Sequence, residues 1–155
     1  MLRLMCKGKI HRATVTEADL NYVGSITIDA DLMRHARIHS YEMVQITNLR
    51  NATRWKTYAL PAEPGSGKIG LNGPPALLFQ PGDLVIILSL ALMDEREMGS
   101  LQPNVVFVDE RNRVIRVETH DLVVQEQESF RQESSDEERK HELDQVEQIS
   151  SDEES

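Results

Sequence analysis

Cysteine, long apolar runs and concentrated basic charge are all scarce in this sequence. Of its 155 residues only Cys6 is a cysteine, which excludes a disulfide within the chain and is typical of a reducing compartment. No apolar run approaches the roughly 20 residues of a membrane-spanning helix. Residues 1–8 are too short and too polar for a signal peptide. The sequence therefore predicts a cytoplasmic protein.

No segment gathers the lysines and arginines that a nucleic-acid-binding surface needs. Residues 121–155 hold 13 Asp and Glu against 3 Lys and Arg, whereas residues 1–120 are nearly neutral. A polar, acidic segment cannot bury enough apolar surface to offset the entropy lost on ordering. We expect one domain over residues 1–118 and a disordered, solvating tail over 119–155. The alternative for the tail is a docking segment for a basic partner.

Short alternating segments separated by turns predict a mainly β domain with short helices, and a small β-barrel is favoured. Strands are expected at residues 2–15, 25–29, 42–49, 54–60, 84–88, 105–108 and 114–117, with a helical turn at 93–98. The almost wholly apolar strand at 84–88 is expected to be buried on both faces. Loops are expected at 61–68 and 80–83.

Two further helix starts are indicated by capping residues. In Thr16–Asp19 a hydroxyl is followed three residues later by a carboxylate, which predicts a helical turn ending near Tyr22. A second short helix, at 32–36, can be capped by Asp29 or by Asp31.

The stretch Tyr22-Val23-Gly24-Ser25 could carry chemistry on its own backbone. Gly24 has access to backbone angles that are closed to other residues, so its carbonyl could be turned toward the Ser25 hydroxyl. Attack on that carbonyl needs a strained turn and nearby hydrogen-bond donors. Gly-Ser pairs are also common in ordinary turns, so the dipeptide alone leaves both interpretations open.

Two strands carry polar side chains on one face. Lys9 and His11 share a face, which could bind an anion or shift protons, or could belong to a solvated edge strand. Arg54, Lys56 and Tyr58 share a face of a later strand. The planar fork of Arg54 suits a carboxylate. Tyr58 could donate a proton, although half-buried tyrosines in strands are usually structural.

Other cofactor patterns are missing. Gly65-Ser66-Gly67-Lys68 lacks both the upstream glycine and the trailing Ser or Thr of a phosphate-binding loop. His35 and His39 have no partner pattern for a metal. Neither a nucleotide nor a metal site is expected, and there is no pattern dedicated to pyridoxal phosphate.

Four segments taken together resemble the pyruvoyl-dependent aspartate decarboxylases, which make β-alanine for pantothenate and coenzyme A synthesis. They are residues 7–25, 54–58, 72–73 and 80–83, in order and at the family's spacing, within a resemblance over residues 1–118. The resemblance implies a six-stranded double-psi β-barrel, L-aspartate as substrate, and a homotetramer with active sites between subunits.

The resemblance also implies self-cleavage. The Ser25 hydroxyl attacks the Gly24 carbonyl, an ester forms by N-to-O acyl shift, and elimination releases residues 1–24 as a β-chain. Hydrolysis then leaves a covalently bound pyruvoyl group at position 25, the start of the α-chain, which serves as the electron sink for decarboxylation. His11, Tyr22 and Thr57 match processing residues, but the sequence does not identify the base that removes the Ser25 α-proton.

The remaining roles follow in the same way. Lys9 and Arg54 match carboxylate-binding residues, and we assign them the carboxylate that is retained, since stabilising the departing one would oppose the reaction. Tyr58 matches the proton donor. Thr57 matches a residue that takes part in processing and also contacts the substrate. In a regular strand, however, its side chain points away from that of Tyr58. We therefore expect a bulge in this strand or a subunit boundary through the site.

The turn at Asn72 and Gly73 could present backbone amides to a ligand, and in the family this turn and the two residues after it contact substrate. Here those two are Pro74 and Pro75, where the family commonly has small residues. Proline has no N–H, so any contact needing donors at these two positions is absent.

Two other functions stay open. Ser25 could survive cleavage as the nucleophile of an N-terminal nucleophile hydrolase, or an uncleaved barrel could act as a binding or regulatory module. The mass of the larger fragment separates these readings, because pyruvoyl formation removes the serine nitrogen and hydrolysis keeps it.

Overall fold

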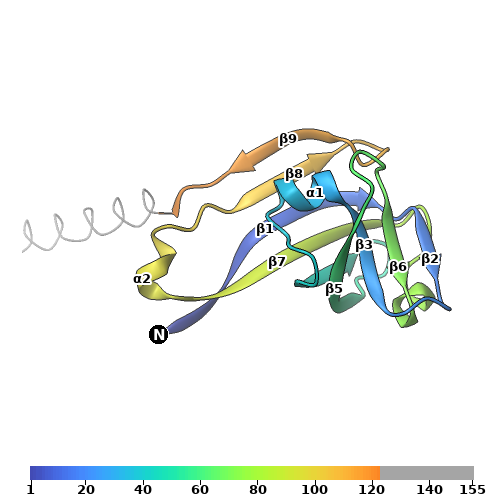
Figure 1. The fold of residues 1–155 in the computed structure, drawn as a ribbon, viewed down its shortest axis with the longest axis horizontal. Coiled ribbons are helices and arrows are strands. Elements are labelled where there is room, and N and C mark those ends of the chain that lie inside the picture. Colours follow the sequence, from blue (N-terminus) through green and yellow to red (C-terminus); the bar gives the residue numbers. More distant parts are fainter. Residues whose placement is uncertain (123–155) are drawn as a thin grey trace, which may run out of the picture. The chain divides into compact units, whose positions relative to one another are not determined.

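Strands joined by tight turns make up most of the computed structural model, which describes residues 1–122 (Figure 1). The tail expected over 119–155 therefore lies almost wholly outside the described residues. The nine strands of the described part are β1 (Leu2–Thr14), β2 (Glu17–Asp19), β3 (Ser25–Asp29), β4 (Met43–Asn48), β5 (Arg54–Ala62), β6 (Ile69–Asn72), β7 (Leu84–Asp94), β8 (Asn104–Val108) and β9 (Val114–Thr119). The helices are α1 (Ala30–His35), α2 (Glu95–Met98) and a 3-10 turn, η1 (Pro74–Leu77).

The strands form one continuous hydrogen-bonded sheet in the order β2-β6-β3-β5-β4-β7-β1-β8-β9. β1 and β7 run together as a long antiparallel pair (Figure 1), while β1 pairs with β8 and β3 with β5 in parallel. The register of β1 against β7 shifts twice, and at the second shift Arg12 has a φ of 58°. The mainly β prediction is confirmed, and the packed unit spans Met1–His120.

The predicted helical turn after Thr16 is wrong, because Glu17–Asp19 forms β2 and pairs in parallel with β6. The Thr16 hydroxyl does not cap a helix. It accepts a hydrogen bond from the Ile69 N–H and donates one to the Ile69 carbonyl, both at 3.0 Å. The Thr16 hydroxyl therefore hydrogen-bonds to β6, which is distant in sequence, instead of capping a local helix.

The second predicted helix is confirmed as α1, and Asp29 is its cap. The Asp29 carboxylate accepts from the N–H of Asp31 at 2.8 Å and also from Gly65 and Gly67 across the chain. The Asp29 carboxylate therefore caps α1 and also holds the loop that contains Gly65 and Gly67. That loop is shorter than predicted, since Pro61 and Ala62 still pair with β3.

The core lies between the inward faces of the strands and α1. In β7, Val85 and Ile87 are fully buried, but Leu84, Ile86 and Leu88 remain partly exposed, so the prediction of burial on both faces is wrong. The largest fully buried side chains are Phe79, Ile10, Ile26, Ile28, Leu32, Ile46, Ile69, Leu71 and Ile87. No helix within residues 1–122 is long and apolar enough to cross a membrane.

A buried carboxylate ties two turns together. Asp83 ends the predicted turn at 80–83 and accepts hydrogen bonds from Arg50 at 2.7 and 3.0 Å, from Asn48 at 2.7 Å and from the Gln80 N–H at 2.9 Å. The Arg50 guanidinium and these further donors lower the pKa of Asp83 to about 2.

This depressed pKa predicts a specific acid sensitivity. Because the folded pKa lies below the ordinary value of 3.8, the contribution of Asp83 is complete above about pH 4 and is lost as the pH falls toward 2. Asp83→Asn should be less stable at pH 7 and should lose less stability between pH 4 and 2. Urea unfolding at pH 7, 4 and 2.5 measures this, and equal pH dependence in the two chains would contradict it.

Candidate active site

Ser25 is the first residue of β3 and is fully buried between β5 and β6. Asn72 is its direct partner on β6. The Asn72 side-chain N–H₂ donates to Ser25 Oγ at 2.9 Å and to Thr27 Oγ1 at 2.8 Å. Asn72 was predicted to contact substrate, and in the structure it holds the serine itself.

This arrangement gives the Ser25 hydroxyl oxygen a fixed hydrogen-bond donor. The amide donor occupies a lone pair of Oγ, so the O–H points elsewhere, and a fixed donor stabilises negative charge that develops on that oxygen. Thr27 Oγ1 accepts the second amide proton of Asn72. Within residues 1–122, no carboxylate or imidazole hydrogen-bonds to Ser25.

At this site the residue with a left-handed backbone conformation is Gly73. Its φ is 78°, and a Cβ there would lie 2.9 Å from the Cα of Gly24. The Gly73 N–H donates to the Asp19 carbonyl at 2.7 Å. Gly24 itself has no positive φ and room for a Cβ. Gly24 therefore does not use the left-handed conformation that glycine allows, and it packs closely against Gly73.

Pro74 and Pro75 fit the turn that follows. They are the first two residues of η1, where a backbone N–H has no partner within the helix. The helix is closed by the Ala76 N–H, which donates to the Gly73 carbonyl at 2.9 Å. The prolines thus preserve the local fold while supplying no donors.

The register of β5 against β3 brings one predicted residue toward Ser25. Ile26 pairs with Ala59 in parallel, so continuing the register by one residue to the start of β3 sets Ser25 beside Tyr58. Thr57 is buried and Tyr58 is half-buried, as alternation requires. The register of β5 has no shift, so the expected bulge is wrong, and Thr57 and Tyr58 point to opposite faces of a regular strand.

Tyr22, Thr27 and Asn72 line a cavity of about 500 Å³, and Asn72 is the residue that hydrogen-bonds to the buried Ser25. Its charged lining groups are Glu17, Asp19, Glu63 and Lys68, with Lys68 paired to Glu17. Three carboxylates and one ammonium do not attract a dicarboxylate. Groups that bind a substrate carboxylate must therefore come from outside this lining.

Arg54 is available for that task. It lies exposed on the same face of β5 as Tyr58, two alternations upstream, as predicted. Within residues 1–122 neither Arg54 nor Lys9 forms an ion pair, so both cationic groups are free for a ligand.

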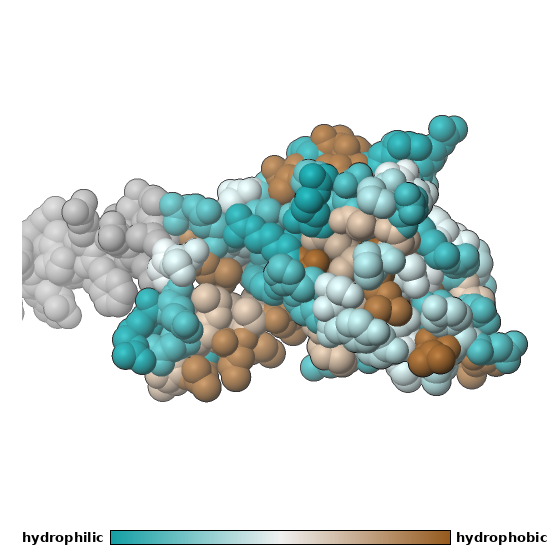
Figure 2. All heavy atoms as spheres, in the orientation of Figure 1, coloured by the Kyte–Doolittle hydropathy of each residue, from teal (hydrophilic) through white to brown (hydrophobic). Residues whose placement is uncertain are grey.

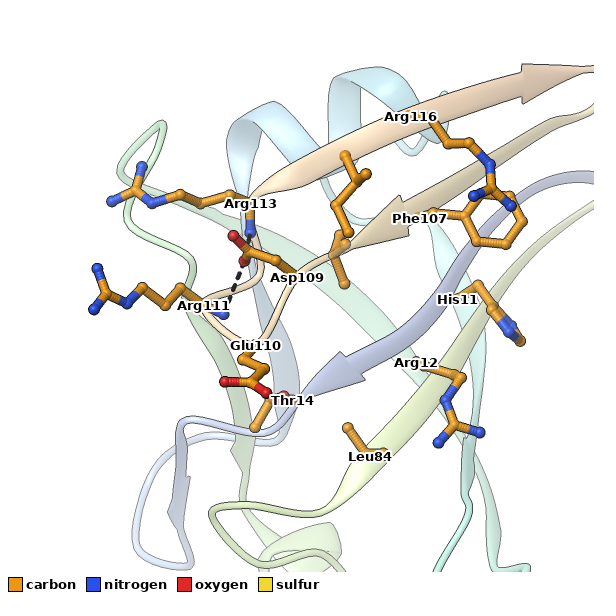
Figure 3. A pocket seen from close by; sticks show the side chains of 12 residues that line it. His11, Arg12, Thr14, Leu84, Phe107, Asp109, Glu110, Arg111, Arg113 and Arg116 are labelled. Carbon is orange, nitrogen blue, oxygen red and sulfur yellow. Dashed lines mark hydrogen bonds between the residues drawn. The ribbon is translucent and has the colours of Figure 1, made fainter.

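Lys9 and His11 lie on β1, which three strands separate from β3 in the sheet. In the described part of the chain, neither hydrogen-bonds to Ser25. His11 lines a groove of about 710 Å³ that also carries four arginines (Figure 3): Arg12, Arg111, Arg113 and Arg116.

His11 sits edge-on to Phe107, with ring centroids 5.4 Å apart, and its Nδ1 is buried without a hydrogen-bond partner in the described residues. Burial and the nearby cationic groups of Lys9, Arg12 and Arg116 lower the pKa of this imidazole. This shift favours the neutral form of the ring. Within the described residues of a single chain, Asn72 contacts Ser25 and Tyr58 lies on the neighbouring strand, whereas Lys9 and His11 lie on β1, three strands further along the sheet.

Two residues near the site escaped the sequence analysis. Thr27 could have been found, because it lies two residues after Ser25 in an alternating strand and so shares its face. Tyr41 stacks on Tyr58, with ring centroids 5.4 Å apart and planes 12° from parallel. No pattern in the sequence indicates that contact.

Residues 1–115 match the family described as aspartate decarboxylase. The chain is 52% identical over 122 residues to the aspartate 1-decarboxylase of Carboxydothermus hydrogenoformans, covering 79% of this chain and 96% of that protein. It is 52% identical over 117 residues to that of Moorella thermoacetica, covering 76% and 91%. It is 50% identical over 121 residues to that of Acetivibrio thermocellus, covering 78% and 96%.

Proposed function

The chain belongs to the aspartate decarboxylase family, and from this membership we propose that a pyruvoyl group made from Ser25 carries its reaction. The activity is the conversion of L-aspartate to β-alanine and CO₂, a step of pantothenate synthesis. One observation supports the proposed cofactor above others. Ser25 is buried at the start of β3, held by Asn72 and next in register to Tyr58.

The surroundings of Ser25 fit a small keto group. The side chain is fully buried, and the Asn72 amide can donate to a carbonyl oxygen as it does to the hydroxyl. When present, a pyruvoyl group supplies an electrophilic carbonyl that binds the substrate amine and accepts the electrons left by CO₂.

Processing rests on residues around the Gly24–Ser25 bond. Asn72 orients Ser25 Oγ and stabilises the charge that develops on it. Gly73 packs against Gly24 and fixes the approach of the chain to β3. Thr57, buried on the neighbouring strand β5, is the proposed donor to the carbonyl under attack.

In turnover, Arg54 binds the retained carboxylate through its planar fork, with Lys9 as a second cation. Tyr58 lies next in register to position 25 and delivers a proton to the carbon that loses CO₂. Asn72, Gly73 and the apolar rings of Pro74 and Pro75 wall the substrate, and Tyr22 closes the cavity beside them.

We further propose that the enzyme is a homotetramer with sites between subunits, in which Lys9 and His11 serve a neighbouring copy. Their place on β1, which three strands separate from β3 in the order of the sheet, supports this. An apolar surface also supports it: Leu2, Leu4 and Leu92 are 62%, 63% and 64% exposed on the ends of β1 and β7, where Figure 2 shows hydrophobic side chains gathered.

We also propose that residues 1–118 form the family's six-stranded double-psi barrel, that 119–155 is a solvating extension, and that the enzyme works in the cytoplasm. The alternatives are an N-terminal nucleophile hydrolase and an uncleaved binding module, and the mass of the larger fragment separates both from the pyruvoyl enzyme.

Reductive trapping tests the proposed cofactor. Purified protein is incubated with labelled aspartate and cyanoborohydride, which reduces an imine to a stable amine. Label should appear on the fragment that begins at residue 25, and β-alanine formation should stop as label accumulates. β-Alanine formed without trapping would show that another electron sink is used.

A further inference from the structure

Tyr41 occupies an unfavourable position for a tyrosine. Its side chain is 71% exposed and its φ is 64°, a left-handed conformation that bulky residues rarely adopt. Its ring stacks on the ring of Tyr58, with the planes 12° from parallel. Strained residues of this kind concentrate where the surrounding structure over-determines them, often at functional sites.

The backbone on either side of Tyr41 is clamped to β5. The Tyr41 N–H donates to the Ala59 carbonyl at 2.8 Å, and the Ala59 N–H donates to the Glu42 carbonyl at 2.9 Å. Both hydrogen bonds are made by Ala59, the residue after Tyr58. They therefore hold the backbones that carry the two rings at a fixed separation.

The Glu42 side chain also holds this turn in place through hydrogen bonds. Its carboxylate accepts from Lys7 Nζ at 2.8 Å, from the His39 N–H at 3.0 Å and from the Ser89 hydroxyl. Although burial opposes it, these donors hold the pKa of Glu42 below its usual value. The turn at 39–42 is thereby fixed to β1 and β7 as well as to β5, which gives Tyr41 a rigid support.

We propose that Tyr41 is a positioning residue, which holds the Tyr58 ring in the orientation from which its hydroxyl delivers the proton. The inference rests on the proposed role of Tyr58 as proton donor. Tyr58 is only half-buried on the open face of β5, and in the described residues Tyr41 is the aromatic ring that restricts its movement. Tyr41 acts through Tyr58 and leaves substrate binding to other groups.

The first test compares Tyr41→Gly with Ala52→Gly. Ala52 has a similar left-handed backbone, with a φ of 58°, in the loop at the other end of β4, and it carries no ring. Both changes relieve the backbone, but only the first removes the stack. Tyr41→Gly should lower kcat about three- to tenfold, the worth of an aromatic pair, with KM and self-cleavage unchanged. Ala52→Gly should match the unaltered chain, and Tyr41→Phe should restore kcat.

The second test repeats Tyr41→Gly in a Tyr58→Phe background. If Tyr41 acts through the Tyr58 hydroxyl, it should have no further effect on the residual rate there. An equal loss in both backgrounds, or a Tyr41→Gly enzyme with normal kcat, would overturn the inference. Full activity of Tyr58→Phe alone would instead refute Tyr58 as proton donor, and with it any action of Tyr41 through that hydroxyl.

Discussion

Ser25→Ala is expected to leave the 155-residue chain in one piece and to reduce β-alanine formation to the uncatalysed rate. The hydroxyl is the only atom of residue 25 that can attack the Gly24 carbonyl, so without it neither cleavage nor the keto group can form. Since enzymes accelerate their reactions by about 10⁶-fold or more, the loss should be of at least that order. Denaturing gels and β-alanine release measure both effects.

Ser100→Ala is the matched control for this change. Ser100 is exposed, and its hydroxyl donates only to the nearby Glu97 carbonyl in the described residues. That variant should be cleaved and active like the unaltered chain. A Ser25→Ala protein that still formed β-alanine would show that the electron sink lies elsewhere.

Arg54→Ala is expected to separate turnover from processing. Arg54 lies on the open face of β5 with no ion pair in residues 1–122, upstream of Tyr58, which lies beside Ser25. Loss of two charge-assisted hydrogen bonds to a carboxylate should lower kcat/KM by about 10²- to 10³-fold. Cleavage should go to completion, because no step of it uses a carboxylate.

Lys56→Ala serves as the control for Arg54→Ala. It removes a positive charge from the same face of the same strand, two residues away, and should change kcat/KM little. Decarboxylation retained by Arg54→Ala, or an equal loss in the two variants, would contradict the assignment of the substrate carboxylate to Arg54.

The strands could be read from the sequence because alternation is a local signal. Ser25–Asp29 was predicted as a strand starting at the serine, and the shared face of Arg54 and Tyr58 follows from the same period of two. Thr16 shows the limit of local reasoning. Its capping pattern was present, but hydrogen bonds to Ile69, 53 residues away, determined the structure.

The contacts that make the site depend on pairings that no local pattern encodes. Asn72 reaches Ser25 across 47 residues of sequence, through the antiparallel pairing of β3 with β6. Tyr41 stacks on Tyr58 from a left-handed backbone conformation that its residue type disfavours. The family resemblance identified Asn72 as a site residue, but it predicted neither the Asn72–Ser25 contact nor the Tyr41–Tyr58 contact.

An intact mass spectrum of the purified, denatured protein is the first measurement to make. Self-processing predicts two chains, residues 1–24 and residues 25–155, with the larger one starting in a pyruvoyl group that lacks the serine nitrogen. A larger chain that starts with an unmodified serine would contradict the proposed cofactor and favour a hydrolytic nucleophile. A single uncut chain that nonetheless decarboxylates aspartate would contradict the role of the Gly24–Ser25 bond altogether.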